Sequence, residues 1–238
     1  MPKRTVKMTA VMLFALGSTP LCADALIVRA TGPSAAKYLA GKSVSSKAQI
    51  VLKSGDQLTL LDSKGTRTLS GPGTFSPSGS SGGDKSSTLA ALINNAGSRQ
   101  VRTGAIRGDT SSDGPPHPSS IWSLDVAQSG TMCTNDLSKI SLWRQNNDAA
   151  TTMIVSSSSG EGSAQARWRA GQSTTLLSAA GLAIKNGASY KFQLAGQVPT
   201  LVTIKLVSPT SSTPSDVARA FISNGCTTQL NQLIAAGQ

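Results

Sequence analysis

The residue types that most often form catalytic and metal sites are few and widely spaced in this chain. A single histidine, His117, lies among the prolines at positions 115, 116 and 118. One histidine cannot form a histidine-based metal cluster, and the cysteines are too few for a structural zinc site. We therefore expect His117 to be an exposed linker residue without a catalytic role, and we expect no metal or cofactor.

The acidic residues offer one arrangement that could hydrolyse a glycan. Asp56 and Asp62 lie on neighbouring predicted turns, and glycoside hydrolases use a pair of carboxylates as acid and as base or nucleophile. Most acids of the chain fall in such turns, where Asp stabilises the backbone by itself. An enzyme acting on cell-wall or polysaccharide material is therefore an alternative hypothesis, and a protein without catalytic residues is the first.

Two short motifs are similar to enzyme motifs but are incomplete. Residues 79–86 come close to a phosphate-binding loop, but Asp84 stands where that loop needs a glycine before Lys85. Residues 34–37, Ser-Ala-Ala-Lys, match the S-x-x-K of penicillin-binding enzymes, whose Lys-Thr-Gly and Ser-Asp-Asn elements are missing here. We assign neither activity, and we expect a single helical turn at residues 34–40.

The first 25 residues have the layout of a secretory signal peptide. A basic start is followed by an apolar run at residues 8–17 and by an A-x-A pattern that ends at Ala25. The apolar run is well short of the roughly 20 residues that span a bilayer. We predict cleavage near Ala25, a mature chain without a transmembrane segment, and a periplasmic or secreted location.

Cleavage there removes one of the three cysteines, Cys22, and leaves Cys133 and Cys226. Lipidation of Cys22 is a weak alternative, because Leu21 precedes it where Gly, Ala or Ser is usual. An even pair of cysteines in an exported protein predicts a disulfide. The alternative is two buried free thiols. A Cys133–Cys226 bond would hold the C-terminal tail on the second half of the chain.

The charge balance favours anionic partners. The formal charge is +11, and it becomes +9 when the signal takes away three basic residues and one acid. Basic residues are scattered, whereas a nucleic-acid groove needs clustered charge with stacking aromatic rings, so we consider nucleic acid an unlikely partner. The alternation of charged and apolar residues at 167–169 predicts a strand with outward arginines and an inward Trp168. The candidate contacts to an anionic partner are Arg99, Arg102, Arg107, Arg167 and Arg169.

The spacing of apolar runs and turns predicts a mainly β protein in two parts. Short strands alternate with Gly and Asp turns over residues 26–75, followed by a Ser/Gly loop at 76–87 and a short helix at 88–95. An edge strand is expected at 101–106, and the proline-rich residues 109–120 form a linker. Strands about every 8–12 residues, among them 121–126 and 139–144, then predict an Ig-like β-sandwich over residues 121–208. Helical spacing after Thr213-Pro214 predicts a helical tail at 209–238.

Residues 27–75 resemble the exported β-domain of FecR-type proteins. The residues that carry the resemblance are 48–61, with the turn Gly55-Asp56, and Gly65-Thr66-Arg67. The whole chain also resembles a group of uncharacterised exported proteobacterial proteins, through residues 71–75, 120–122, 129–133 and 225–226. FecR-type sensors carry a cytoplasmic segment and a membrane span before this domain, and here a signal peptide stands in their place. The resemblance therefore implies a FecR-like β-domain at 26–108 and a periplasmic binding role, without direct regulation of a sigma factor.

Together these observations predict an exported, non-enzymatic binding or scaffold module of the bacterial envelope. Its partner would be an envelope protein or an anionic polysaccharide. Besides the enzyme with Asp56 and Asp62, an accessory subunit of a membrane-bound sensor or protease is the remaining alternative.

Overall fold

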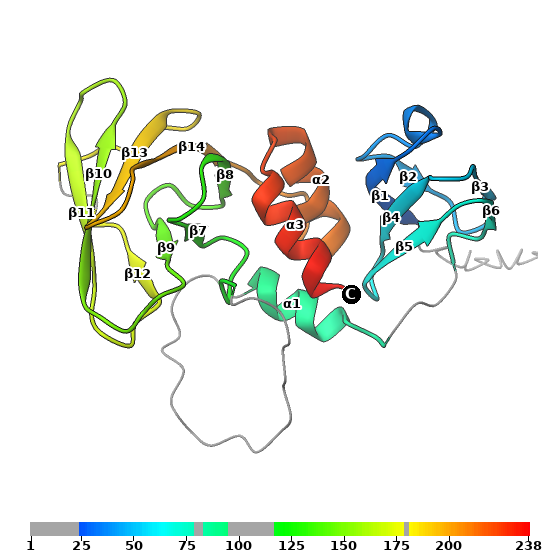
Figure 1. The fold of residues 1–238 in the computed structure, drawn as a ribbon, viewed down its shortest axis with the longest axis horizontal. Helices are drawn as coiled ribbons and strands as arrows, with labels where there is room; N and C mark the ends of the chain where they lie inside the picture. The colour runs from blue at the N-terminus through cyan, green and yellow to red at the C-terminus, as the bar shows by residue number, and fades with distance from the viewer. Residues whose placement is uncertain (1–23, 79–82, 95–116, 179–180) are drawn as a thin grey trace, which may run out of the picture.

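The structure is a computed structural model that describes residues 24–78, 83–94, 117–178 and 181–238. It confirms a mainly β fold with C-terminal helices, and Figure 1 shows those helices between two β-rich parts. We call residues 24–78 the N-terminal β unit, 121–207 the C-terminal β unit and 209–238 the helical tail. The FecR-like and Ig-like assignments of the two units stay predictions.

The N-terminal β unit is built around a four-stranded antiparallel sheet in the order β2-β1-β4-β5. A second antiparallel pair, β3 with β6, packs beside it, and a 3-10 turn, η1 (Ala35–Lys37), forms at the predicted helical turn. The strands are β1 (Ala25–Thr31), β2 (Ser43–Val44), β3 (Ile50–Leu52), β4 (Gln57–Leu61), β5 (Thr66–Ser70) and β6 (Gly73–Phe75).

The Gly55-Asp56 turn of this unit is held by a buried carboxylate. Asp56 is only 2% exposed, and its two oxygens accept hydrogen bonds from the backbone N–H groups of Ser34 (2.8 Å) and Lys53 (2.5 Å). Gly32 packs against it so closely that an added Cβ would lie 2.5 Å from the carbonyl oxygen of Gly55. Asp56 therefore joins the turn after β1 to the turn before β4.

Helix α1 (Ser86–Asn94) forms where the short helix is predicted, and its C-terminal carbonyls receive donors from the next described segment. The backbone N–H of Ile121 donates to the oxygen of Leu92 (3.0 Å), and Trp122 Nε1 donates to that of Ile93 (2.9 Å). A strand over residues 121–126 is wrong in extent, because only β7 (Leu124–Asp125) is extended. Ile121 and Trp122 pack instead against α1 and the helical tail.

The C-terminal β unit consists of two sheets that share one hydrophobic core. The larger has the order β11-β10-β13-β14-β8, and the smaller has the order β12-β9-β7. Most pairs are antiparallel, but β14–β8 and β7–β9 are parallel. The remaining strands are β8 (Gly130–Thr134), β9 (Ser141–Trp143), β10 (Thr151–Ser157), β11 (Ser163–Trp168), β12 (Thr174–Leu176), β13 (Ser189–Leu194) and β14 (Thr200–Leu206).

The helical tail consists of α2 (Pro214–Asn224) and α3 (Thr227–Ala236). The hydroxyl of Thr213 accepts a hydrogen bond from the N–H of Asp216 and so caps the start of α2, and Pro214 follows at its first position. Gly225 ends α2 in the left-handed conformation, with φ +74°, which glycine adopts without steric cost. These are the start and stop signals that the sequence carries.

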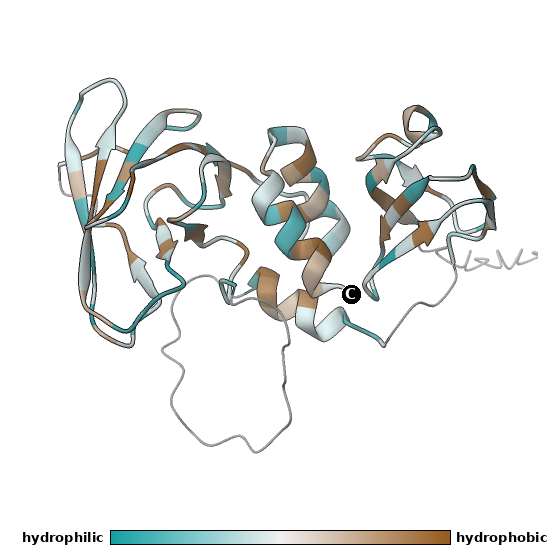
Figure 2. Ribbon diagram, viewed as in Figure 1, coloured by the Kyte–Doolittle hydropathy of each residue, from teal (hydrophilic) through white to brown (hydrophobic). Residues whose placement is uncertain are grey.

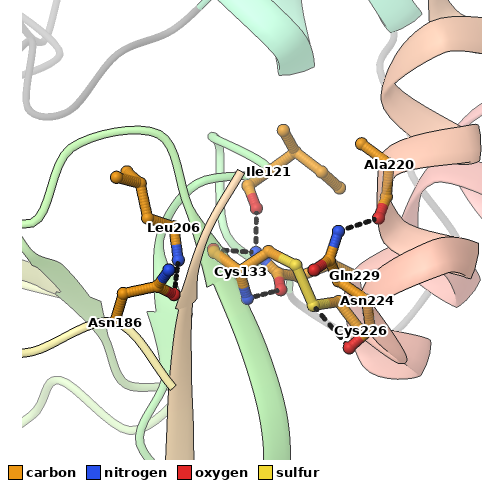
Figure 3. The surroundings of a disulfide bond; sticks show 8 residues. All are labelled: Ile121, Cys133, Asn186, Leu206, Ala220, Asn224, Cys226 and Gln229. Carbon is orange, nitrogen blue, oxygen red and sulfur yellow. Dashed lines mark hydrogen bonds between the residues drawn. A yellow bond between two sulfur atoms is a disulfide. The ribbon is translucent and has the colours of Figure 1, made fainter. Parts of the chain in front are cut away.

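A disulfide between Cys133 and Cys226 joins the tail to β8, as predicted (Figure 3). Both cysteines are fully buried. Beside the bond, the side-chain oxygen of Gln229 accepts from the N–H of Cys133 (2.6 Å), and its Nε2 donates to the oxygens of Cys133 (2.7 Å) and Ile121 (2.7 Å). The amide of Gln229 thus pairs with β8 as a neighbouring strand would, at the edge of the larger sheet.

The same tail also packs on the N-terminal β unit, which the sequence does not predict. Leu26 and Leu61 of the sheet share a core with Phe221 and Leu233 of the tail and with residues of α1, and Figure 2 shows hydrophobic positions on these facing helices. Polar contacts surround this core. Arg219 donates to the oxygen of Gly41 (2.7 Å) and to the Ser43 hydroxyl (3.1 Å), and Arg29 donates to Asn231.

The end of the chain lies against the β4–β5 turn. The N–H of Thr66 donates to the oxygen of Gly237 (2.8 Å), and its hydroxyl donates to that of Ile234 (2.7 Å). An added Cβ on Gly65 would lie 2.6 Å from the Gly237 oxygen, so the approach depends on glycine. The tail therefore bridges both β units, with a covalent bond to one and hydrogen bonds to the other.

No helix in the described ranges is both long and apolar enough to cross a membrane.

Candidate functional site

The strongest candidate site lies where β11 ends. Burial alternates along this strand as predicted, so that Trp168 is 2% exposed whereas Arg167 and Arg169 are exposed. The two arginines line an open depression of about 930 Å³. Thr151, Thr152 and Gln172 contribute hydroxyl and amide groups to the same depression.

The floor of this depression is held by a buried arginine from the neighbouring sheet. Arg144, which follows β9, is 5% exposed and lies over the ring of Trp168, with 5.7 Å from its guanidinium carbon to the ring centroid. Its Nε donates to the oxygen of Gln172 (3.1 Å), and its Nη2 donates to that of Arg169 (3.1 Å). Burial lowers the pKa of the Arg144 guanidinium, and the nearby charge of Asp148 opposes this shift.

A second loop fixes the turn that carries Arg169. The N–H of Gly171 donates to the oxygen of Asn147 (2.7 Å), and Asn147 Nδ2 donates to the Ser173 hydroxyl (3.0 Å). The N–H of Arg169 donates to the Gln172 side chain (3.1 Å). Because the backbone is held at several points, the Arg169 side chain projects from a defined position, which lowers the entropy lost when a ligand binds.

The two exposed arginines keep their charge available to a ligand. Arg167 donates to the side-chain oxygen of Gln165 (3.1 Å), which is neutral. Within the described residues, the single salt bridge joins Lys185 to Glu161, at the other end of β11. Two guanidinium groups at an open depression can bind carboxylate, phosphate or sulfate groups by paired hydrogen bonds.

The structure brings together only part of the predicted set of arginines. Arg167 and Arg169 lie side by side on the depression. Arg99, Arg102 and Arg107 lie outside the described residues. So do the expected edge strand at 101–106, residues 1–23 of the predicted signal peptide and most of the predicted proline-rich linker.

Asp56 and Asp62, which carry the enzyme hypothesis, are both engaged by backbone N–H groups. Burial by itself raises the pKa of the Asp56 carboxyl, but the hydrogen bonds from Ser34 and Lys53, with the charge of Lys53, outweigh it and hold this pKa below its usual value. Asp62 accepts from the N–H groups of Lys64 (2.8 Å) and Gly65 (3.2 Å). A catalytic acid needs a raised pKa, and the shift at Asp56 is in the opposite direction.

The other candidate catalytic residues also contact neighbouring residues in the chain. His117 Nδ1 lies 3.1 Å from the oxygen of Pro118, and Lys37 of the S-x-x-K motif lies over the ring of Tyr38. Asp84 accepts from the N–H of Ser86 (2.8 Å) at the start of α1. Among the described residues, no three His, Cys, Asp or Glu side chains come together as metal ligands.

Two polar residues of structural importance are not recognised from the sequence. Arg144 stands at the end of a predicted strand, where a charged residue usually points to solvent, and nothing nearby in sequence indicates the carbonyls that it binds. Gln229 lies in the second predicted helix near the apolar positions Leu230 and Leu233. The helical spacing that places Gln229 on the same side as these apolar residues is the one sequence feature that indicates its burial.

No protein-family model, curated protein or solved structure matches the chain.

Proposed function

We propose that this protein is an extracytoplasmic binding module of the bacterial envelope that recognises an anionic polymer without catalysing a reaction. The observation that carries the proposal is the pair of exposed guanidinium groups, Arg167 and Arg169, at a depression whose lining backbone is held by Arg144. The chain as a whole carries a formal charge of +11, which attracts polyanions over a longer range.

The disulfide supports the location. Cys133 and Cys226 are bonded in the structure, and disulfides persist in oxidising compartments such as the periplasm or the cell exterior. Together with the signal-like residues 1–25, this bond supports an exported protein. The proposed cleavage near Ala25 rests on the A-x-A pattern alone.

We also propose the finer fold assignments as part of this function. The N-terminal β unit would be a FecR-like domain, in which Asp56 of the Gly-Asp turn joins two turns of the β structure. The C-terminal β unit would be an Ig-like sandwich that presents the binding face. The helical tail has a disulfide to the C-terminal β unit and packs on the N-terminal β unit, and it would hold the two units as one scaffold.

The proposal is tested with the mature, oxidised protein and an immobilised linear polyuronate such as polygalacturonate. We expect binding that weakens with added salt, because exposed charges are screened, and no binding to neutral dextran. Replacing both arginines (Arg167→Gln with Arg169→Gln) is expected to weaken binding about two- to thirty-fold, because each exposed charge pair contributes about 0.2–1 kcal/mol.

The matched control removes two charges from the N-terminal β unit, by Lys42→Gln with Lys47→Gln. Both lysines are exposed and far in sequence from the depression. If the arginine and lysine variants weaken binding equally, or if neither does, the site assignment is wrong. Capture of an envelope protein that depends on Arg167 and Arg169, with no polyuronate binding, would favour the protein partner instead.

A further inference from the structure

The outer face of the larger sheet has an unusual charge content. The five strands β8, β10, β11, β13 and β14 contain no acidic residue. Their three basic residues, Arg167, Lys191 and Lys205, lie on the face opposite the buried core. Arg167 and Lys191 are exposed, whereas Lys205 is half-buried and pairs with Cys133, where the disulfide joins the helical tail to this sheet. A sheet face with cations and without carboxylates is complementary to a polyanion.

The strand register places these cations on one diagonal. Arg167 of β11 pairs with Thr152 of β10, and Lys191 of β13 pairs with Ser156, four residues further along β10. Two strand spacings and four residues separate the Cα atoms of Arg167 and Lys191 by about 17 Å.

The diagonal continues in the same direction beyond Lys191. Lys191 pairs with Leu201 of β14, and Lys205 lies four residues beyond Leu201, away from the Arg167 end. One strand spacing and four residues separate Lys191 from Lys205 by about 14 Å. Arg169 extends the line at the opposite end, two residues beyond Arg167, so that the four cations follow each other across the sheet.

The surface between the cations is suited to sugars. The outward positions of β10, β11 and β13 carry hydroxyl and amide groups, which can bond sugar hydroxyls: Thr152, Ser156, Ser163, Gln165, Ser189 and Gln193. Among them lie two exposed apolar side chains, Ile154 at 46% and Leu201 at 56% exposure. Such side chains can pack on the C–H faces of sugar rings, and a polyphosphate has no such faces.

We infer that this diagonal, from Arg169 through Arg167 and Lys191 to Lys205, is a track for one extended chain of a linear acidic glycan. The inference rests on the proposed function and names its ligand as a chain of carboxylated sugars that is long enough to cross the sheet. A short oligomer would occupy only the depression at Arg167 and Arg169, whereas a long chain would reach both lysines.

Chain length therefore provides the test. The mature, oxidised protein is titrated with a short oligogalacturonate and with long polygalacturonate. We expect tighter binding of the long chain per binding site. We also expect the double variant Lys191→Gln with Lys205→Gln to weaken long-chain binding about two- to thirty-fold and to leave short-oligomer binding unchanged. The Arg167→Gln with Arg169→Gln variant should weaken both, and Lys42→Gln with Lys47→Gln neither.

The variants distinguish the extended track from the depression alone. If the arginine variant weakens binding but the lysine variant binds long chains as the wild type does, the site is confined to the depression and the track is wrong. If the arginine variant binds as the wild type does, the proposed function is wrong.

Polyphosphate that binds as tightly as polygalacturonate, with no loss on Ile154→Ser, would overturn the assignment to a glycan. Because Ile154 and both lysines are at outward positions, these variants should keep the wild-type melting temperature, which circular dichroism checks.

Discussion

Removing the Cys133–Cys226 disulfide should cost this protein a large part of its stability. The bond closes a loop with a sequence separation of 93 residues. The entropy that such a closure removes from the unfolded chain corresponds to about 4.6 kcal/mol at 25 °C. Since a typical domain is stable by only about 5–15 kcal/mol, the double variant Cys133→Ala with Cys226→Ala should unfold far more easily.

Urea denaturation followed by tryptophan fluorescence measures this loss. With a dependence of about 2 kcal/mol per M urea, the unfolding midpoint should fall by about 2 M. The wild type in a reducing agent is the control, because it loses the same bond and should unfold close to the double variant. A loss below about 1 kcal/mol in both samples would refute the reasoning. It would show that the bond does not restrict the unfolded chain as the loop-closure estimate requires.

Three further predictions follow from single residues. Gln229→Leu should lower the free energy of unfolding by about 2–4 kcal/mol, because it leaves the N–H and oxygen of Cys133 unpaired in the interior; an unchanged urea midpoint would contradict this role. Phe221→Ala should cost about 3–5 kcal/mol, since its ring is fully buried and lies 5.6 Å from that of Trp122. A loss as small as that of an alanine substitution at an exposed position would show that the core shared by the tail, α1 and both β units is not closely packed around Phe221. Asp56→Asn should destabilise the protein at neutral pH, and the difference from wild type should shrink as the pH falls through the lowered pKa of Asp56. Melting temperatures at pH 7 and pH 3 test this, and equal differences at both would refute it.

The position of the helical tail explains why several of these changes should act on the whole molecule. The tail is covalently bonded to β8 and shares its core with β1, β4 and α1. Among the described residues, the buried side chains form three clusters, and the one around the tail includes residues from both β units. Loosening the tail therefore exposes apolar surface on both sides, whereas a change within one sheet acts mainly on that sheet.

Local features of this fold are predictable from the sequence because they depend on neighbouring residues. Thr213-Pro214 and Gly225 set the ends of α2 by capping and by backbone conformation, so the helix appears where expected. Alternation along residues 165–169 places Trp168 inside and Arg167 outside. The disulfide between Cys133 and Cys226 is the pairing that the sequence predicts when Cys22 is assigned to a signal peptide.

The failures at residues 121–126 and at Gln229 have another origin. Ile121 and Trp122 belong to an apolar run that favours a strand. In the structure they lie outside any sheet, because they pack against α1 and the tail and donate hydrogen bonds to the carbonyl oxygens at the end of α1. Gln229 is buried because Ile121 and Cys133, 108 and 96 residues away, present unpaired backbone groups to it. Neither partner can be recognised from residues nearby in sequence.

The sequence alone determined the mainly β class, the basic charge, the cysteine pair and the inward and outward faces of β11, because each depends on composition or short-range periodicity. Only the tertiary structure decided that the helical tail joins both β units, that Arg144 supports the arginine depression, and that four cations lie on one diagonal. These arrangements depend on strand order and on contacts between residues far apart in the chain. Strand order follows from how whole sheets and helices bury their apolar faces together, which no single segment specifies.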